Sequence, residues 1–203
     1  MAVQWVVKVG GSFAGSDHLP RWLDALAAAH VVIVPGGGPF ADAVRNAQRR
    51  WRFDDLTAHR MAIYGMVQYG LMLGGLCPRL RMASDRKSLE NIVATGESVV
   101  WLPDESTLSG EDLAASWNVT SDSLAAWLAN GMRARRLLLV KSGTLPNGAA
   151  RAAQLAAAGL IDRAFPRMIG HAAHETWLCG PGDWRHLPAG LSDPQAVFTP
   201  VIP

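Results

Sequence analysis

Residues 3–12 are VQWVVKVGGS, an apolar run that ends in a lysine and two glycines. The run is short, rich in β-branched residues and nearly continuous in apolar character, which is typical of a strand buried on both faces of its sheet. Similar runs recur at residues 31–34, 98–102, 137–140 and 176–179. Ala- and Leu-rich stretches of helical character lie at residues 20–29, 39–50, 57–73, 121–130 and 149–158. This alternation predicts an α/β sandwich around a mainly parallel sheet.

Length and composition set outer limits on the protein. The chain has 203 residues, 49% apolar and 18% charged, so we expect a single domain over residues 1–203. A formal net charge of +2 gives no case for a nucleic-acid partner. No apolar stretch approaches the roughly 20 residues of a membrane span, and the N-terminus is typical of a strand rather than a signal peptide. We therefore expect a soluble, cytoplasmic protein that binds neither nucleic acid nor membrane, with Cys77 and Cys179 as free thiols.

Two segments in the last third of the chain carry weaker structural signals. The stretch from Pro188 onward contains further prolines and predicts an irregular segment with one edge strand at residues 196–199. His171 and His174 lack the spacing of a zinc protease motif, which favours a packing role over a metal site.

The first chemical motif is Lys8-Val9-Gly10-Gly11-Ser12, at the end of the first predicted strand. A lysine there places its ammonium group at the carboxyl end of the sheet, where α/β proteins gather ligands. Two glycines let the backbone approach a phosphate, and successive N–H groups form an anion-binding nest. The alternative is a plain strand-to-helix turn with a surface lysine.

The second motif is the glycine run Gly36-Gly37-Gly38, between a predicted strand and a helix that starts with Pro39. Three consecutive glycines cost backbone entropy, which favours a tight turn with close ligand approach over a strained loop without a ligand. The helix N-terminus beyond them favours an anionic group. Arg45, about one and a half turns further along, is a candidate for contact with an acceptor phosphate.

The third motif surrounds Asp122, in the expected first turn of a helix. Asn118, Thr120 and Ser121 place amide and hydroxyl groups just before it, and Thr120 or Ser121 can cap the helix. Asp122 is either part of a site or simply a carboxylate at the positive end of a helix. Likewise, Lys141 either faces a nucleotide or is an exposed lysine at a strand end. His59, on the helix predicted at residues 57–73, lines an acceptor pocket or faces solvent.

Taken in order, these three motifs resemble the amino acid kinase superfamily. The matching residues are Lys8-x-Gly10-Gly11-Ser12, Gly36-Gly37-Gly38-Pro39-Phe40 and Asn118-x-Thr120-Ser121-Asp122-Ser123-x-Ala125-Ala126. The resemblance runs over nearly the whole chain and implies a three-layer α/β/α sandwich that transfers a phosphoryl group from ATP. It also implies Mg²⁺ that arrives with ATP, held mostly by phosphates and water, and a homo-oligomer.

The resemblance implies a role for each matching residue. Lys8 would neutralise the phosphoryl group in flight, and Asp122 would organise the site by accepting hydrogen bonds from Lys8 and nearby N–H groups. Asn118 would contact the substrate. The loops would hold the two phosphates in line, with Gly10, Gly11 and Ser12 on the ATP side and Gly36, Gly37 and Gly38 on the acceptor side. Outside these motifs, the residues themselves suggest Lys141 for the ATP side and Arg45 for the acceptor side.

One segment separates the branches of this superfamily. The acetylglutamate branch has a second lysine where residues 159–165 offer Arg163, which keeps the charge with a different geometry. Residues 116–127 and 159–166 are similar to the branch that phosphorylates aminomethylfuran methyl phosphate in methanofuran biosynthesis, part of one-carbon metabolism. That similarity implies a phosphate monoester converted to a diphosphate. A carboxylate kinase for a small amino acid, and a non-catalytic nucleotide-binding or structural relative, are the alternatives.

Overall fold

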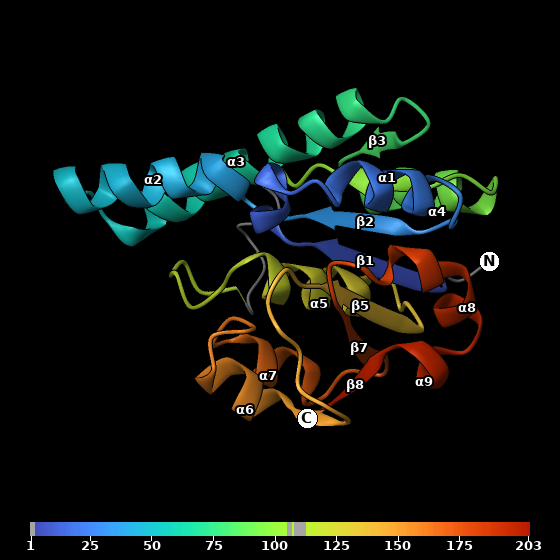
Figure 1. Cartoon of the computed structure of the whole chain (residues 1–203). Helices are drawn as coiled ribbons and strands as arrows, with labels where there is room; N and C mark the ends of the chain where they lie inside the picture. The colour runs from blue at the N-terminus through green and yellow to red at the C-terminus, as the bar shows by residue number, and fades with distance from the viewer. Residues whose placement is uncertain (1–2, 105–106, 108–112) are drawn as a thin grey trace.

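The computed structural model describes residues 3–104, 107 and 113–203 (Figure 1). At its centre lies an eight-stranded sheet with the order β3-β4-β2-β1-β5-β7-β8-β6. The strands are β1 (Trp5–Val9), β2 (Val32–Pro35), β3 (Arg81–Ala83), β4 (Val99–Trp101), β5 (Arg136–Val140), β6 (Ala150–Arg151), β7 (Glu175–Cys179) and β8 (Thr199–Ile202). The strands from β3 to β7 in this order are all parallel, whereas β8 pairs antiparallel with β7 and β6 runs parallel to β8. The mainly parallel sheet predicted from the sequence is confirmed.

Helices cover both faces of this sheet (Figure 1). They are α1 (Leu19–Ala27), α2 (Gly38–Trp51), α3 (Asp55–Leu76), α4 (Arg86–Ala94), α5 (Ser121–Gly131), α6 (Ala152–Ala157), α7 (Phe165–Ile169), α8 (Leu187–Ser192) and α9 (Pro194–Val197), with short 3-10 turns η1 (Gly11–Gly15) and η3 (Asp183–His186). One face packs against α1, α8 and the C-terminal half of α3, and the other against α4 to α7. The three-layer α/β/α sandwich is therefore confirmed. Among the residues that the structure describes, no helix is long and apolar enough to cross a bilayer.

The alternation of side chains along β1 decides where its lysine points. Val7 packs with Trp22 of α1 in the core on one face, and Val6 packs with Leu124 of α5 in the core on the other. Both faces are buried, which explains why the strand is apolar almost throughout. Because successive side chains point to opposite faces, Lys8 lies on the same face as Val6 and is directed toward α5.

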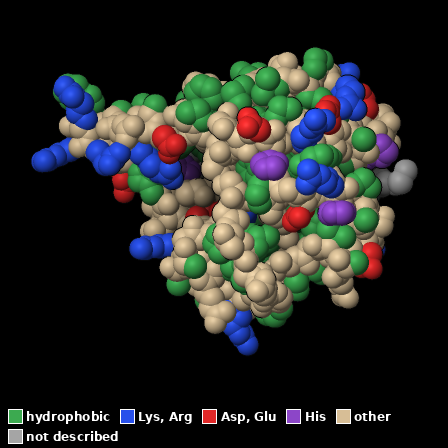
Figure 2. All heavy atoms as spheres, in the orientation of Figure 1, with side chains coloured by type: hydrophobic (Ala, Val, Ile, Leu, Met, Phe, Trp, Pro, Cys, Tyr) green, Lys and Arg blue, Asp and Glu red, His purple; other side chains and the backbone are tan. Residues whose placement is uncertain are grey.

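The α2–α3 hairpin projects past the sheet (Figure 1). Arg52, with φ 57°, ends α2, and Asp54 caps α3 by accepting hydrogen bonds from the N–H and hydroxyl of Thr57, both at 2.8 Å. The two helices pack closely, since a Cβ atom at Gly65 would lie 3.0 Å from the backbone nitrogen of Ala41. Figure 2 shows basic side chains gathered on the projecting end, where Arg49 and Arg50 lie in the last turn of α2.

Several expectations for the C-terminal third are wrong. Of the edge strand expected at residues 196–199, the first two residues end helix α9, and β8 begins only at Thr199. Pro188 and Pro194 each lie in the first turn of a helix, where proline is favoured, so the segment expected to be irregular is largely helical. The helix expected at residues 149–158 begins as the short strand β6 and becomes helical only at Ala152.

Strand β3 and helices α4 and α7 were not anticipated either. β3 is a three-residue edge strand whose Arg81 and Met82 are exposed, so it carries no apolar run. Helix α4 has a clear local cause, since the carboxylate of Asp85 accepts a hydrogen bond from the N–H of Ser88 at 2.9 Å. Helix α5 extends to Gly131, one residue beyond the range expected, and the left-handed residue that follows it is Arg133.

Candidate active site

A buried carboxylate lies between two lysines at the carboxyl ends of β1 and β5. Lys8 precedes the last residue of β1, Lys141 follows β5, and Asp122 lies in the first turn of α5. Lys8 pairs in register with Leu139, so both lysines emerge at the same edge of the sheet. The ammonium of Lys8 lies 2.9 Å from Asp122, and that of Lys141 donates to both carboxylate oxygens at 2.7 Å. Since Lys141 is only 8% exposed, it is not the exposed strand-end lysine that the sequence left open.

The two lysines decide the protonation state of Asp122. Burial by itself would raise the pKa of this carboxyl, but the charges of Lys8 and Lys141 and their hydrogen bonds lower it to about 2. Asp122 is therefore ionised near neutral pH and cannot accept a proton there. Its physical role is to compensate and position two ammonium groups that burial would otherwise destabilise.

Asp162, in the loop between α6 and α7, caps the helix that carries Asp122. One carboxylate oxygen accepts hydrogen bonds from the N–H groups of Thr120 and Ser123, at 2.8 and 2.9 Å, and from the Thr120 hydroxyl at 2.9 Å. The other accepts from the Ser123 hydroxyl and from the Phe165 N–H. The N–H of Asp162 in turn donates to Asp122 at 3.2 Å. The expected cap by the Thr120 or Ser121 side chain is wrong, because a carboxylate from a distant loop fills that position.

We expect the replacement Asp162→Ala to lower the free energy of unfolding by about 2–3 kcal/mol, because it leaves the half-buried N–H groups of Thr120 and Ser123 without acceptors. Thermal unfolding followed by circular dichroism measures the effect. Asp85→Ala, which removes an exposed cap that serves α4 alone, is the matched control and should lower the midpoint less. Equal losses in the two variants would contradict a special role for Asp162.

The structure places two predicted site residues away from this cluster. Arg163 and Asn118 are both exposed, and neither lines the cavity that the described residues form. The Asn118 carbonyl accepts a hydrogen bond from the N–H of Ala164 at 3.0 Å and so holds two loops together. The segment expected to deliver a second cation delivers Asp162 to α5, and Lys141 supplies the second cation beside Asp122. A catalytic role for Arg163 and a substrate contact for Asn118 stay predictions.

The two glycine loops lie backbone against backbone. A Cβ atom at Gly11 would lie 2.3 Å from the nitrogen of Gly38, and one at Gly36 would lie 2.3 Å from the nitrogen of Gly11. Gly38 also has φ +54°, a left-handed conformation that favours glycine. Contact between the loops thus explains these glycines before any ligand is considered. The hydroxyl of Ser12 lies 2.7 Å from that of Ser142, which joins the segment after Lys8 to the segment after Lys141.

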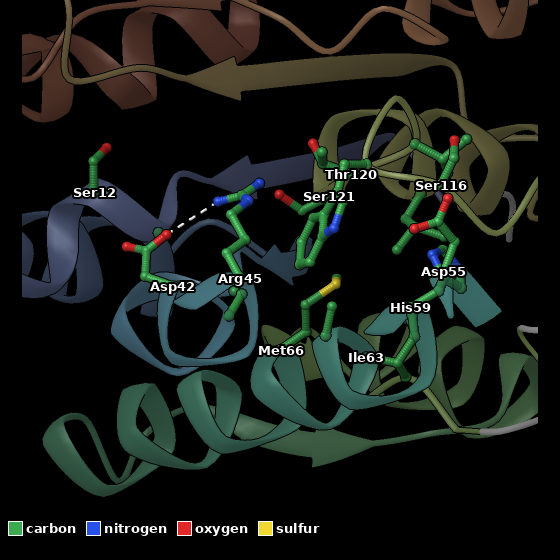
Figure 3. A pocket seen from close by; sticks show the side chains of 18 residues that line it. Ser12, Asp42, Arg45, Asp55, His59, Ile63, Met66, Ser116, Thr120 and Ser121 are labelled. Carbon is green, nitrogen blue, oxygen red and sulfur yellow. Dashed lines mark hydrogen bonds and ion pairs between the residues drawn. The ribbon is translucent and has the colours of Figure 1, made fainter. Parts of the chain in front are cut away.

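A cavity of about 290 Å³ opens between the α2–α3 hairpin, the glycine loops and the start of α5 (Figure 3). Its lining includes Gly11, Ser12, Gly37, Gly38, Asp42, Arg45, Asp55, His59, Ile63, Met66, Ser116, Trp117, Thr120, Ser121 and Leu124. Ser12 and Asp42 lie toward one end of it, and Asp55, His59 and Ser116 lie toward the other (Figure 3). The cavity therefore has a glycine-loop end, a partly apolar middle and a polar far end.

Aromatic and basic side chains hold the wall of this cavity in place. The guanidinium of Arg45 lies 4.4 Å from the ring centroid of Trp117 and 3.0 Å from the carboxylate of Asp42 (Figure 3). The Trp117 ring N–H donates to the side-chain oxygen of Gln48 at 2.6 Å. His59 is buried and lines the cavity, and burial lowers its pKa, so that its ring is uncharged at neutral pH. The alternative that His59 faces solvent is therefore excluded.

Fold and site together define an α/β protein with a buried lysine–aspartate–lysine cluster and two glycine loops at the carboxyl edge of its sheet. Comparison with known proteins makes this class specific, because the amino acid kinase family matches residues 4–143. The chain belongs to the amino acid kinase family, and it is thus a member of a family of ATP-dependent phosphotransferases.

Individual relatives are distant. The (5-(aminomethyl)furan-3-yl)methyl phosphate kinase of Methanocaldococcus jannaschii is 26% identical over 138 residues, which are 66% of this chain and 63%, or less than two thirds, of that relative. Among solved structures, uridylate kinase from Archaeoglobus fulgidus aligns with TM-score 0.73 and 15% identity over 98% of this chain and 100% of its own. Isopentenyl phosphate kinase from T. acidophilum aligns with TM-score 0.60 and 12% identity, over 98% and 100%. At such identities these structures establish the fold alone.

Proposed function

We propose that the chain transfers the γ-phosphoryl group of ATP to a small phosphate monoester, (5-(aminomethyl)furan-3-yl)methyl phosphate, and so makes a diphosphate. The observation that carries the proposal is the buried Lys8–Asp122–Lys141 cluster beside a cavity that ends in two glycine loops. Phosphoryl transfer asks a protein mainly for positioning and charge stabilisation, which this arrangement supplies. The furan acceptor is suggested by the name of the M. jannaschii relative and by residues 116–127 and 159–166.

In the proposed step, an oxygen of the acceptor phosphate forms a bond to the γ-phosphorus of ATP while the bond to the bridging oxygen breaks and ADP leaves. A phosphate monoester is already ionised near neutral pH, since its second pKa is about 6. The step therefore needs no general base, which agrees with a carboxylate whose pKa is held at about 2. This favours an ionised acceptor over an alcohol, and the relative's name favours a phosphate over a carboxylate.

We propose that Mg²⁺ enters the site with ATP. Over the described ranges there is no group of three or more His, Cys, Asp or Glu side chains placed to hold a metal ion. Phosphate oxygens and water would then be its main ligands, as is usual for Mg²⁺ bound to a nucleotide. There it would neutralise charge between the phosphates. On the protein side, Lys8, Lys141, Gly10, Gly11 and Ser12 would hold the phosphates of ATP.

The test is ADP release from Mg-ATP with five acceptors, followed by phosphorus NMR of the products. The acceptors are aminomethylfuran methyl phosphate, isopentenyl phosphate, uridylate, acetylglutamate and aspartate. A new diphosphate signal with the furan phosphate alone is the expected result. Turnover with acetylglutamate or aspartate alone would support the kinase activity and contradict the proposed phosphate acceptor. Turnover with none of the five would favour the non-catalytic alternative, a nucleotide-binding or structural role.

We expect activity to fall as the pH rises through about 8. Burial lowers the pKa of Lys141 to about 8, and the charge of Lys8 acts in the same direction against the attraction of Asp122. The Lys141 side chain is positively charged below that pKa and neutral above it. Its contribution to phosphate binding therefore disappears at alkaline pH. The ratio kcat/KM for ATP reports the free enzyme and should decline near pH 8, while kcat declines at higher pH because bound phosphates stabilise the ammonium.

A pH series from 6 to 10 at limiting and saturating ATP measures both declines. Lys141→Arg keeps its charge over this range and should remove the decline in kcat/KM near pH 8. If the decline persists unchanged in that variant, another group is responsible for it.

We also propose that the chain forms a homodimer through the outer face of α3. Met61, Leu71 and Leu76 are exposed there, and Met82 of the edge strand β3 lies against Gly74 of the same helix, which extends the apolar surface. Contiguous exposed apolar patches mark association surfaces in many proteins. Sedimentation velocity at micromolar concentration should show a dimer or larger ring, and a clean monomer would overturn the proposal.

A further inference from the structure

The ionisable side chains that line the cavity do not balance. Asp42 and Arg45 form an ion pair at 3.0 Å and cancel each other's charge. His59 is uncharged at neutral pH, because burial lowers its pKa. Asp55 is the remaining carboxylate of the lining, at the end away from Ser12 and Asp42 (Figure 3). The end with Asp42 and Arg45 thus carries no net side-chain charge, and the other end carries a negative charge that the lining does not compensate.

The local fold holds Asp55 in place without neutralising it. The cap of α3 is made by the neighbouring Asp54, so the helix does not depend on Asp55 for its first hydrogen bond. The side-chain N–H of Gln48 donates to Asp55 at 2.9 Å, and Gln48 is itself fixed by the ring N–H of Trp117. An amide donor orients a carboxylate but leaves its charge, which is the arrangement expected of a group that meets a cation.

We propose that Asp55 binds a positively charged amine on the acceptor, whose phosphate lies at the glycine-loop end. The inference rests on the proposed function and deepens it, because it assigns a residue of the cavity to the amine of the proposed acceptor. The apolar side chains of Ile63, Met66 and Leu124 line the space between and suit a ring or short hydrocarbon spacer. Acceptors without an amine offer no cation to the Asp55 carboxylate and bind less tightly.

The experiment compares two acceptors that differ only in the amine, (5-(aminomethyl)furan-3-yl)methyl phosphate and (5-methylfuran-3-yl)methyl phosphate. With the wild-type protein, we expect KM to be about tenfold lower for the amine than for the methyl compound. This is the size of effect typical of one charge-assisted hydrogen bond at a partly exposed site. In Asp55→Asn, KM for the amine should rise about tenfold, KM for the methyl compound should stay within about twofold, and kcat should change little for either.

Asp54→Asn is the matched control. It removes a neighbouring charge, keeps a good capping residue and leaves the cavity lining intact, so both KM values should stay near wild type. If Asp55→Asn changes KM equally for the two acceptors, or changes neither, the inference is overturned while the proposed function stands. If the wild-type protein turns over neither compound, the proposed function fails, and this inference fails with it.

Discussion

Replacing Lys8 with alanine is expected to reduce kcat by about a thousandfold. The Lys8 ammonium lies in the buried cluster with Asp122 and Lys141, at the sheet edge where the glycine loops meet. A preorganised charge aimed at a phosphoryl group in flight acts mainly on the transition state, and removal of one such group typically costs two to three orders of magnitude in kcat. Nucleotide binding should largely persist, because the loop N–H groups and Lys141 remain.

Two measurements separate these effects: steady-state ADP release for kcat and calorimetric titration of Mg-ATP for binding. Lys87→Ala is the control, since Lys87 is an exposed lysine on α4, far along the chain from the cluster, and its removal should leave both quantities unchanged. If Lys8→Ala turns over at the wild-type rate, Lys8 is not the residue that stabilises the transferred group. Loss of binding equal to the loss of turnover would assign Lys8 to ground-state binding of ATP instead.

The second large effect is expected for Asp122→Asn, this time on stability. The variant keeps the shape of the side chain but leaves two buried ammonium groups without their counter-charge. Removing one partner of a buried ion pair typically destabilises a protein by about 3–5 kcal/mol. For a chain of this size, the unfolding midpoint should fall by on the order of 10 °C. Differential scanning calorimetry at pH 7 measures the change.

The pH dependence of that loss identifies its cause. In the variant, the folded-state pKa of a buried lysine lies below its value in the unfolded chain, so the penalty is full below the folded pKa and shrinks as the pH rises above it. We therefore expect the stability deficit of Asp122→Asn to become smaller between pH 7 and pH 9. A deficit that is constant over this range would point to lost packing. Asp24→Asn, at an exposed pair with Arg79, is the control and should change little at either pH.

The central strands and the two glycine loops could be predicted because their causes are local. A strand buried on both faces must be apolar at nearly every position, as β1, β2, β5 and β7 are. A lysine in such a strand, such as Lys8, stands out for the same reason. Lys141 could not be assigned from the sequence, because its burial depends on α5 and on Asp122, which lies 19 residues earlier in the chain.

Asp162 shows why part of the site escaped prediction. Its hydrogen bonds reach Thr120 and Ser123, 42 and 39 residues earlier in the chain, and no local pattern records such a pairing. The sequence predicted a role for its neighbour Arg163 instead, because that residue carries the positive charge of the segment. Nor did the sequence offer a reason to propose a role for Asp55, since an acidic residue in the first turn of a helix is already explained by the helix dipole.

The errors outside the site also have physical causes. The residues of β3 carry no apolar run, because an exposed edge strand buries little, and so nothing marks them as a strand. Residues 194–199 contain both a proline that starts a helix and a threonine that starts a strand, and the boundary between the two depends on packing. Short elements are fixed by their tertiary neighbours more than by propensity.

The division of the cavity between two structural parts has a consequence for how such proteins diversify. Lys8 and Lys141, which we propose hold the phosphates, lie at the ends of strands of the central sheet, whereas Asp55, His59, Ile63 and Met66 all belong to one helix of the projecting hairpin. If the proposed roles hold, we expect changes along that helix to alter which acceptor is bound without disturbing the lysines. Acceptor selectivity and catalytic activity could thus change independently during evolution. Exchange of the α2–α3 hairpin between relatives should transfer the acceptor preference of the donor protein and keep the catalytic residues of the recipient.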